Sequence, residues 1–293
     1  MPTDPNVAAP QWFTDAISTP GERHSLEVDG ATIVYRTWGD AGAPGVLLVH
    51  GGGAHGGWWD HLAPQLAAGR RVVALDLSGH GDSDWRETYT FDTWARELHA
   101  VAVAARADHR LLVVGHSLGG VTTATASRLF PELITDIVMI DSEVYDPAVH
   151  GTSRPGGDDQ PSIRSTGRRH YPSRDELLAR YRLVPDHPCL GYAKDYVAAG
   201  SVVSEPEGWR WKFDRTFALH LDPRPPMPAP DTRVTVIRAG RGRMTSYMAG
   251  KIVAELRTVS RIVTFPEAGH HVMLDYPLEL LAEIREAIGR LPG

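Results

Sequence analysis

Six short apolar runs, rich in Val, Ile and Leu, are the feature that most limits how this chain can fold. They occupy residues 46–49, 72–75, 111–114, 137–140, 234–237 and 261–265. Most are uniformly apolar, which is typical of strands covered on both faces. Helical patterns lie between or after them, at residues 92–107, 118–130, 246–256 and 278–289. Strands that alternate with helices predict the α/β class, with a mostly parallel, doubly wound sheet and helices on both faces.

One long segment interrupts the alternation. Residues 142–230 contain no convincing strand, although predicted strands lie on either side. Ser173 and Glu176 form a capping box that predicts a helix here, and residues 190–199 predict a second short helix. Loops this long in a compact domain are usually functional. We therefore expect this insertion to form a mainly helical cap, or lid.

The parts that flank the insertion predict one core domain. Residues 24–36 read as two strands joined at Asp29 and Gly30, a pair typical of a tight hairpin turn. Together with the alternating strands and helices, this hairpin predicts a core domain made of residues 1–141 and 231–293.

Composition excludes several classes of protein. The chain has 293 residues and a formal net charge of -6, so nothing favours nucleic acid as a partner. The one cysteine, Cys189, excludes an internal disulfide framework and fits a reducing compartment. The N-terminal segment lacks the pattern of a signal peptide, and no apolar run approaches membrane-spanning length. We expect a cytoplasmic protein with no membrane partner; the sequence predicts no oligomeric state.

A glycine-rich stretch after the first apolar run permits two interpretations. Gly51, Gly53 and Gly56 spell G-x-G-x-x-G, and Asp76 follows about 20 residues later, as in dinucleotide-binding proteins. That reading requires a helix that begins inside the motif. Residues 54–59, AHGGWW, are a poor helix start. The letters HGGG after a strand also describe the oxyanion-hole loop of an ester-cleaving enzyme, and this second reading is favoured.

The strongest chemical signal is the stretch LLVVGHSLGG at residues 111–120. It places the motif G-x-S-x-G between a predicted strand and a predicted helix, which is the context of a nucleophile elbow. Ser117 is therefore the candidate nucleophile, and a serine nucleophile needs a base. The late stretch TFPEAGHHVMLDYP offers two histidines. We prefer His270 as the base and expect His271 to line the loop or pocket.

Four stretches together, HGGG, DLSGHGDSD, GHSLGG and EAGHHVMLDYP, resemble the α/β-hydrolase superfamily. The resemblance covers nearly the whole chain except the first two dozen residues and the insertion, which sits where that family carries its cap. It implies a serine hydrolase of the esterase or lactonase kind. These motifs are highly specific for the fold and weakly specific for the substrate.

The catalytic acid departs from the family pattern. Most members carry it after the penultimate strand, but here no Asp or Glu occurs between Asp231 and Glu255, and Arg243 stands near the expected position. Some members, including certain lipases, dehalogenases and lactone hydrolases, carry the acid after the strand that precedes the cap. By this resemblance Asp141 is the expected acid, with Glu143 as the alternative.

The remaining site residues are expected around this triad. Two backbone N–H groups should form the oxyanion hole, that of Leu118 and one from the HGGG loop, which we assign to Gly52. Four aromatic residues are candidates for substrate binding or for packing: Trp58, Trp59, Trp209 and Trp211. We expect neither cofactor nor metal, because His50, His55 and His61 lack ligand spacing and the chain has no P-loop.

These observations predict a serine hydrolase that cleaves a carboxylic ester or lactone of a small, apolar molecule. Ser117 would form an acyl-enzyme, His270 would act as the base and Asp141 would hold His270. Four alternatives stay open: hydrolysis of a carbon–carbon bond, hydrolysis of an amide, cofactor-free perhydrolysis, and a non-catalytic relative that binds a small molecule.

Overall fold

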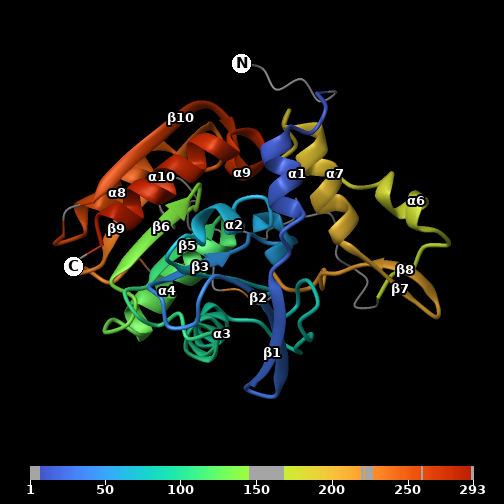
Figure 1. Cartoon of the computed structure of the whole chain (residues 1–293), viewed down its shortest axis with the longest axis horizontal. Coiled ribbons are helices and arrows are strands. Elements are labelled where there is room, and N and C mark those ends of the chain that lie inside the picture. The colour runs from blue at the N-terminus through green and yellow to red at the C-terminus, as the bar shows by residue number, and fades with distance from the viewer. Residues whose placement is uncertain (1–6, 145–167, 219–220, 222–226, 259, 292–293) are drawn as a thin grey trace.

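The computed structural model describes residues 7–144, 168–218, 221, 227–258 and 260–291. Its centre is an eight-stranded sheet with the order β1-β2-β4-β3-β5-β6-β9-β10 (Figure 1). The strands are β1 (Glu22–Val28), β2 (Ala31–Trp38), β3 (Gly45–Val49), β4 (Arg71–Leu75), β5 (Leu112–His116), β6 (Asp136–Ile140), β9 (Arg233–Arg241) and β10 (Arg261–Gly269). In this sheet β1 pairs antiparallel with β2, and β2 pairs antiparallel with β4. The other five pairings of the sheet are parallel.

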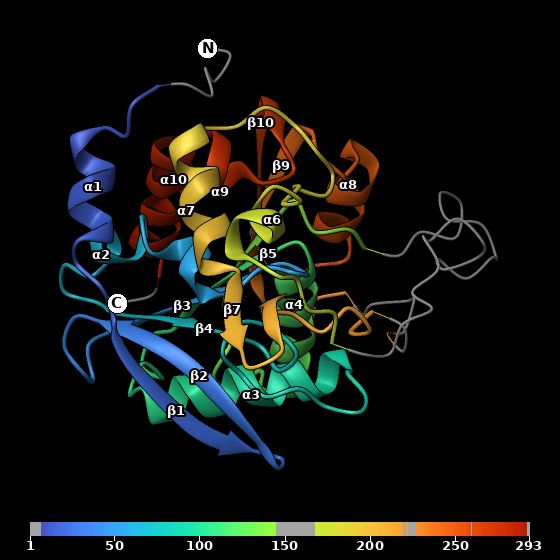
Figure 2. The same ribbon diagram turned by 90° about the vertical axis from the view of Figure 1, so that its right-hand side faces the viewer.

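Helices cover both faces of the sheet, as the uniformly apolar strands predict. The helices of the core are α1 (Gln11–Ile17), the 3₁₀ helix η1 (Gly56–Trp59), α2 (Ala63–Leu66), α3 (Phe91–Ala104), α4 (Leu118–Leu129), α8 (Ser246–Ala254), α9 (Val272–Asp275) and α10 (Pro277–Gly289). Alternate residues of β3 enter different clusters: Val46 and Leu48 pack with α1, α2 and α10, whereas Leu47 and Val49 pack with α3, α4 and α8. Figure 2 shows α3 on the opposite side of the sheet from α1 and α10.

The predicted hairpin is present at the N-terminal edge of the sheet. Val28 pairs with Ala31, so only Asp29 and Gly30 form the turn. Both have positive φ, 47° and 76°, as the two-residue turn that matches the twist of a hairpin requires. The Asp-Gly pair therefore predicted the position of the turn between β1 and β2 correctly.

The described part of the insertion contains two helices and a hairpin. Helix α6 (Arg174–Leu178) begins as predicted, because the Ser173 side chain accepts a hydrogen bond from the Glu176 N–H at 3.1 Å. Helix α7 (Gly191–Gly200) confirms the second helix. The expectation of no strand is wrong, because β7 (Val202–Glu205) and β8 (Gly208–Trp211) pair antiparallel. Residues 145–167 of the insertion lie outside the described residues.

A buried carboxylate joins this insertion to the core. Asp60, directly after η1, accepts a hydrogen bond from the Tyr196 hydroxyl of α7 at 2.9 Å. Its other oxygen, Oδ1, is buried without a hydrogen-bond partner among the described residues. Burial raises the pKa of Asp60 from 3.8 to about 6, although the Arg36 charge and the Tyr196 hydrogen bond act in the opposite direction. The folded protein therefore keeps Asp60 protonated up to about pH 6, whereas the unfolded chain releases this proton near pH 4.

We expect this carboxyl to make the protein less stable as the pH rises. Between about pH 4 and about pH 6 the folded chain holds a proton that the unfolded chain releases, so the free energy of unfolding falls across this window. Asp60→Asn keeps an oxygen for Tyr196 and removes the charge. It should raise the free energy of unfolding near pH 7 by about 1–3 kcal/mol, measured by urea titration.

Asp195→Asn is the matched control, because Asp195 is exposed on the same helix as Tyr196. This control should leave the difference in stability between about pH 5 and about pH 7 as it is in the unmodified protein. If Asp60→Asn also left that difference unchanged, Asp60 would not be the group that titrates.

Candidate active site

Ser117 stands on a sharp turn between β5 and α4. Its backbone angles are φ 52° and ψ -118°, a left-handed conformation that is strained for a residue with a side chain. The Ser117 N–H donates to the Ile140 carbonyl at 2.9 Å, which ties the turn to β6. A Cβ on Gly115 would overlap the carbonyl of Gly119, and a Cβ on Gly119 would overlap backbone atoms of β3. The glycines of G-x-S-x-G are thus required by close backbone contacts.

Asp141 and His270 meet at the carboxyl end of the sheet. Nδ1 of His270 lies 2.6 Å from Oδ2 of Asp141, and both residues are buried. Asp141 has φ 43°, so its backbone is strained at the end of β6, much as at Ser117. A buried carboxylate that contacts Nδ1 fixes the ring orientation and favours a proton on this nitrogen.

The end of β9 and the loop after it hold the Asp141 carboxylate. Oδ2 accepts a hydrogen bond from the Arg243 N–H at 2.7 Å, and Oδ1 accepts from the N–H groups of Ala239 and Met244, both at 3.2 Å. A Cβ on Gly242 would overlap both carboxylate oxygens. The loop that lacks an acidic residue therefore supplies amide donors to an acid on the neighbouring strand.

Glu143, the alternative acid, points to another partner. Its Oε2 accepts a hydrogen bond from Nε of Arg243 at 2.8 Å and lies 2.7 Å from the Arg243 NH2 group. Both side chains are partly exposed, with 34% and 48% of their surfaces accessible. The structure brings only Asp141 into contact with His270, so the geometry favours the first of the two candidates.

Gly52 and Leu118 lie beside each other next to Ser117. A Cβ built on Gly52 would lie 3.9 Å from the Cβ of Leu118 and 2.9 Å from the ring of Phe217. Among the described residues, neither the Gly52 N–H nor the Leu118 N–H has a hydrogen-bond acceptor. Leu118 is also the first residue of α4, where backbone N–H groups are free to bind an anion. These two amides are available to a substrate oxygen.

A cavity of about 470 Å³ opens next to these amides. Its lining residues are Gly52, Gly53, Trp58, Arg180, Tyr181, Arg182, Leu183, Val184, Ser201, Trp211, Phe213, Phe217 and His271. Two of the four tryptophans singled out in the sequence, Trp58 and Trp211, therefore line it. Trp59 instead lies in the hydrophobic core with no exposed surface, and Trp209 packs against Tyr171 within the insertion. Neither is placed to contact a substrate in this cavity.

Three further histidines surround His270. Nε2 of His116 lies 3.0 Å from the His270 carbonyl oxygen, and the rings of His116 and His270 are 4.7 Å apart. Burial, and then the neighbouring His270 and His187, lower the pKa of His271 to about 2. Burial also lowers the pKa of His116 well below its usual value. His116 and His271 are therefore neutral. His187, which comes from the insertion, was not singled out in the sequence.

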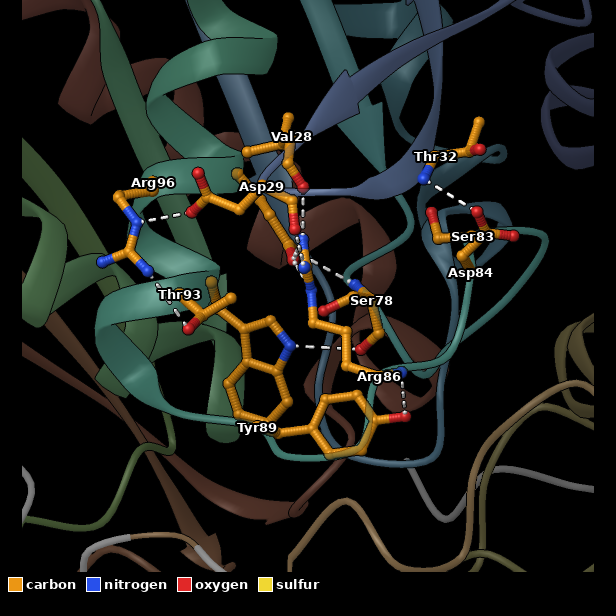
Figure 3. Close-up of polar contacts among 12 residues, drawn as sticks. Val28, Asp29, Thr32, Ser78, Ser83, Asp84, Arg86, Tyr89, Thr93 and Arg96 are labelled. Atoms are coloured by element: carbon orange, nitrogen blue, oxygen red, sulfur yellow. Dashed lines mark hydrogen bonds and ion pairs between the residues drawn. The ribbon is translucent and has the colours of Figure 1, made fainter.

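The loop after β4 has a structural role. The Asp76 carboxylate accepts hydrogen bonds from the N–H groups of Gly56 at 2.6 Å and Asp82 at 2.9 Å. The η1 helix begins at Gly56, the last glycine of the motif, but has only four residues, too short for the helix that a dinucleotide site needs. Further along, Arg86 donates to the Val28 and Asp29 carbonyls and ties the loop to the hairpin (Figure 3). Because the glycine motif opens only this short helix, and because backbone N–H groups occupy the Asp76 carboxylate, the dinucleotide interpretation is excluded.

One group of side chains in the described residues has the spacing of metal ligands. It consists of His170, Glu205 and Glu207, whose ligand atoms lie within 4.8 Å of one another. Glu205 is already paired with Arg210 at 2.7 Å and with Arg168 at 3.4 Å. Two guanidinium groups on the central carboxylate oppose the binding of a cation. This group is better described as an ion-pair network of the insertion.

Fold and site together define the class of α/β hydrolases. The chain belongs to the alpha/beta hydrolase family, whose model matches residues 46–284. Esterase Rv0045c from Mycobacterium tuberculosis is 26% identical over 268 residues, which cover 88% of this chain and 87% of the relative. Among the described residues, no helix combines the length and the apolar character that crossing a bilayer requires.

Other relatives carry out other hydrolyses. A 2-hydroxy-6-oxo-6-(2'-aminophenyl)hexa-2,4-dienoic acid hydrolase from Metapseudomonas resinovorans is 36% identical over 114 residues, 38% of this chain and 39% of the relative. Among solved structures, that of E-2-(acetamidomethylene)succinate hydrolase has a TM-score of 0.73 at 21% identity, covering 92% of this chain and 99% of that one. At 21% identity, this likeness in structure concerns the fold.

Proposed function

We propose that this protein is a serine hydrolase that cleaves a carboxylic ester or lactone of a small, apolar molecule through an acyl-enzyme on Ser117. The observation that carries the proposal is the contact between Asp141 and His270 at the end of the sheet where the strained Ser117 turn stands. The family and its esterase relative support ester hydrolysis at the level of the family. The aromatic side chains of the cavity suit an apolar substrate.

In the proposed reaction, Ser117 Oγ attacks the ester carbonyl while His270 Nε2 takes the hydroxyl proton. The carbonyl oxygen becomes an oxyanion that accepts hydrogen bonds from the Gly52 and Leu118 N–H groups, and each donor lowers the barrier by about 2.7–4 kcal/mol. Asp141 stabilises the His270 cation. Collapse breaks the bond to the alcohol oxygen, which leaves with the proton from His270. A water molecule, deprotonated by His270, then releases the acid and restores the Ser117 hydroxyl.

Cleavage of a carbon–carbon bond on the same triad is the second candidate. The observation that favours it is the 36% identity over 114 residues to the dienoic acid hydrolase, because the compound in that enzyme's name contains no ester or amide bond. The two candidates differ in the group that leaves, a carbanion or an alkoxide. Turnover of a simple aryl ester with no turnover of a vinylogous 1,5-diketone would favour the ester assignment.

A fluorophosphonate probe tests whether Ser117 is an activated nucleophile. The intact protein should be labelled on Ser117, and the Ser117→Ala variant should take up no label, as read by mass spectrometry of the peptide. Prior unfolding in urea should abolish labelling, because activation needs the folded arrangement with His270. If the folded protein took up no label, Ser117 would not be an activated nucleophile. The protein would then be a non-catalytic member of the family that binds small molecules.

A further inference from the structure

We infer that His271 is a specificity-determining residue, whose Nε2 accepts a hydrogen bond from a hydroxyl or amide N–H group on the part of the substrate inside the cavity. This inference rests on the proposed function and names the substrate class: an ester with an apolar body that also carries a hydrogen-bond donor. His187 of the insertion acts as the positioning residue that fixes the tautomer of His271.

The position of His271 supports direct contact with a substrate. It follows the proposed base, His270, and its ring lines the cavity 5.4 Å from the ring of Trp58. Two other polar side chains on this wall have partners in the protein: Ser201 Oγ donates to the Val197 carbonyl at 2.7 Å, and Arg182 donates to backbone carbonyls at 2.7 and 3.0 Å. The unpartnered Nε1 of Trp58 carries a hydrogen and can only donate, so it offers a substrate no acceptor. Among the described residues, Nε2 of His271 has no partner.

A chain of contacts behind His271 determines where its proton sits. It begins at His187, whose Nδ1 lies 3.0 Å from the Pro188 carbonyl oxygen and 3.3 Å from Oδ2 of Asp275. Both neighbours are acceptors, so Nδ1 of His187 carries a hydrogen. The other nitrogen, Nε2, accepts a hydrogen bond from the backbone N–H of His271 at 3.2 Å, which requires a lone pair on it.

The same lone pair fixes the tautomer of His271. Nε2 of His187 lies 2.8 Å from Nδ1 of His271, so this Nδ1 must carry a hydrogen for the contact to be favourable. Because His271 is buried and neutral, its Nε2 is left with a lone pair. The cavity therefore presents an acceptor at this point, which rewards a donor on the substrate.

The arrangement should invert when His187 gains a proton. The Asp275 hydrogen bond and charge raise the pKa of His187 against the effect of burial, and Asp186 on the same loop adds to this. A protonated His187 has no lone pair on Nε2, so the hydrogen bond from the His271 backbone N–H is lost. The Nε2–H of His187 then donates to Nδ1 of His271, which carries its own hydrogen on Nε2. The preference for a substrate that carries a hydrogen-bond donor should therefore be strongest at pH values above the pKa of His187 and should decline at lower pH.

Two pairs of matched esters test the inference: 4-nitrophenyl 4-(hydroxymethyl)benzoate against the 4-ethylbenzoate, and 4-(hydroxymethyl)phenyl acetate against 4-ethylphenyl acetate. They place the hydroxyl in the acyl or in the alcohol half. At about pH 8.5 the ratio of kcat/KM should favour the hydroxyl by about 3- to 10-fold in at least one pair. His271→Phe should bring this ratio to about one.

His187 provides the matched variants. His187→Leu removes the acceptor behind His271 and should lose the preference, whereas His187→Gln offers an amide oxygen and should keep it. A merely structural role for His187 would change kcat for both members of a pair equally and leave their ratio unchanged. A ratio that persists in His271→Phe, or that is absent from both pairs in the unmodified protein, would overturn the inference.

Nitrogen-15 NMR of the full-length protein supplies a readout that does not depend on turnover. The side-chain signals of His271 should show hydrogen on Nδ1 and a lone pair on Nε2 at about pH 8.5. Hydrogen on Nε2 at that pH would contradict the inference even if the esters are cleaved. Absence of any turnover dependent on Ser117, with the expected tautomer present, would instead contradict the proposed function.

Discussion

Replacing Asp141 with Asn is expected to lower kcat for ester hydrolysis by about 10⁴-fold, because the ring of His270 loses the partner that keeps its proton on Nδ1. An asparagine amide has the same shape, but its NH₂ group can only donate. The NH₂ group can face Nδ1 of His270 only if the ring carries its proton on Nε2. Nε2 is then unable to accept the proton of the Ser117 hydroxyl. The measurement is kcat and KM on a 4-nitrophenyl ester.

The same variant has a second expected consequence. Both carboxylate oxygens of Asp141 accept backbone N–H groups, so an asparagine must turn its NH₂ group toward at least one of these donors. An unsatisfied buried donor costs about 1–3 kcal/mol. Circular dichroism and a urea titration should show a folded protein of lower stability, which separates loss of the triad from loss of the fold.

Glu143→Gln is the control for this prediction. Glu143 forms an exposed ion pair with Arg243, and such pairs contribute about 0–1 kcal/mol. We expect kcat to stay within about threefold of the original value. If Asp141→Asn kept its activity and Glu143→Gln lost it, the acid would be Glu143.

Much of the core and of the site could be predicted from the sequence, because those signals are local. Asp29 and Gly30 specify the hairpin turn through their backbone preferences. Ser117 is recognised because strand, glycines and helix occur in register around it. Asp141 is expected from the resemblance to hydrolases that carry the acid after the strand before the cap, because no acidic residue occurs between Asp231 and Glu255. In the structure, backbone amides of Arg243 and Met244 in that loop donate to Asp141.

Other features depend on contacts that a sequence does not display. Trp58 and Trp59 are neighbours in a four-residue 3₁₀ helix, where successive side chains point about 120° apart. One reaches the cavity and the other the core, and no local pattern distinguishes them. His187 contacts His271 across 84 positions of the chain. The β7–β8 hairpin, in contrast, does have a local signal, the Pro-Glu-Gly turn before Trp209.

Gly242→Ala is expected to lower kcat by about 100-fold or more without touching any group that reacts. An added Cβ would overlap both oxygens of Asp141, so either the carboxylate or the loop after β9 must move. A displacement of about 1 Å in a catalytic arrangement can cost about 10²-fold in rate. KM should change less, because Gly242 does not line the cavity. Overpacking of this kind also lowers stability by about 1–3 kcal/mol.

Gly250→Ala is the matched control in the next helix. No atom lies within 4 Å of the position that its Cβ would take, and alanine is favoured over glycine inside a helix by about 0.5–1 kcal/mol. This variant should be slightly more stable and fully active.

The double variant that combines Gly242→Ala with Asp141→Asn gives the decisive comparison, because two changes that act through one carboxylate are not additive. Gly242→Ala should reduce kcat far less in the Asp141→Asn background than alone. Equal losses in both backgrounds would mean that Gly242 affects catalysis by a route other than the acid.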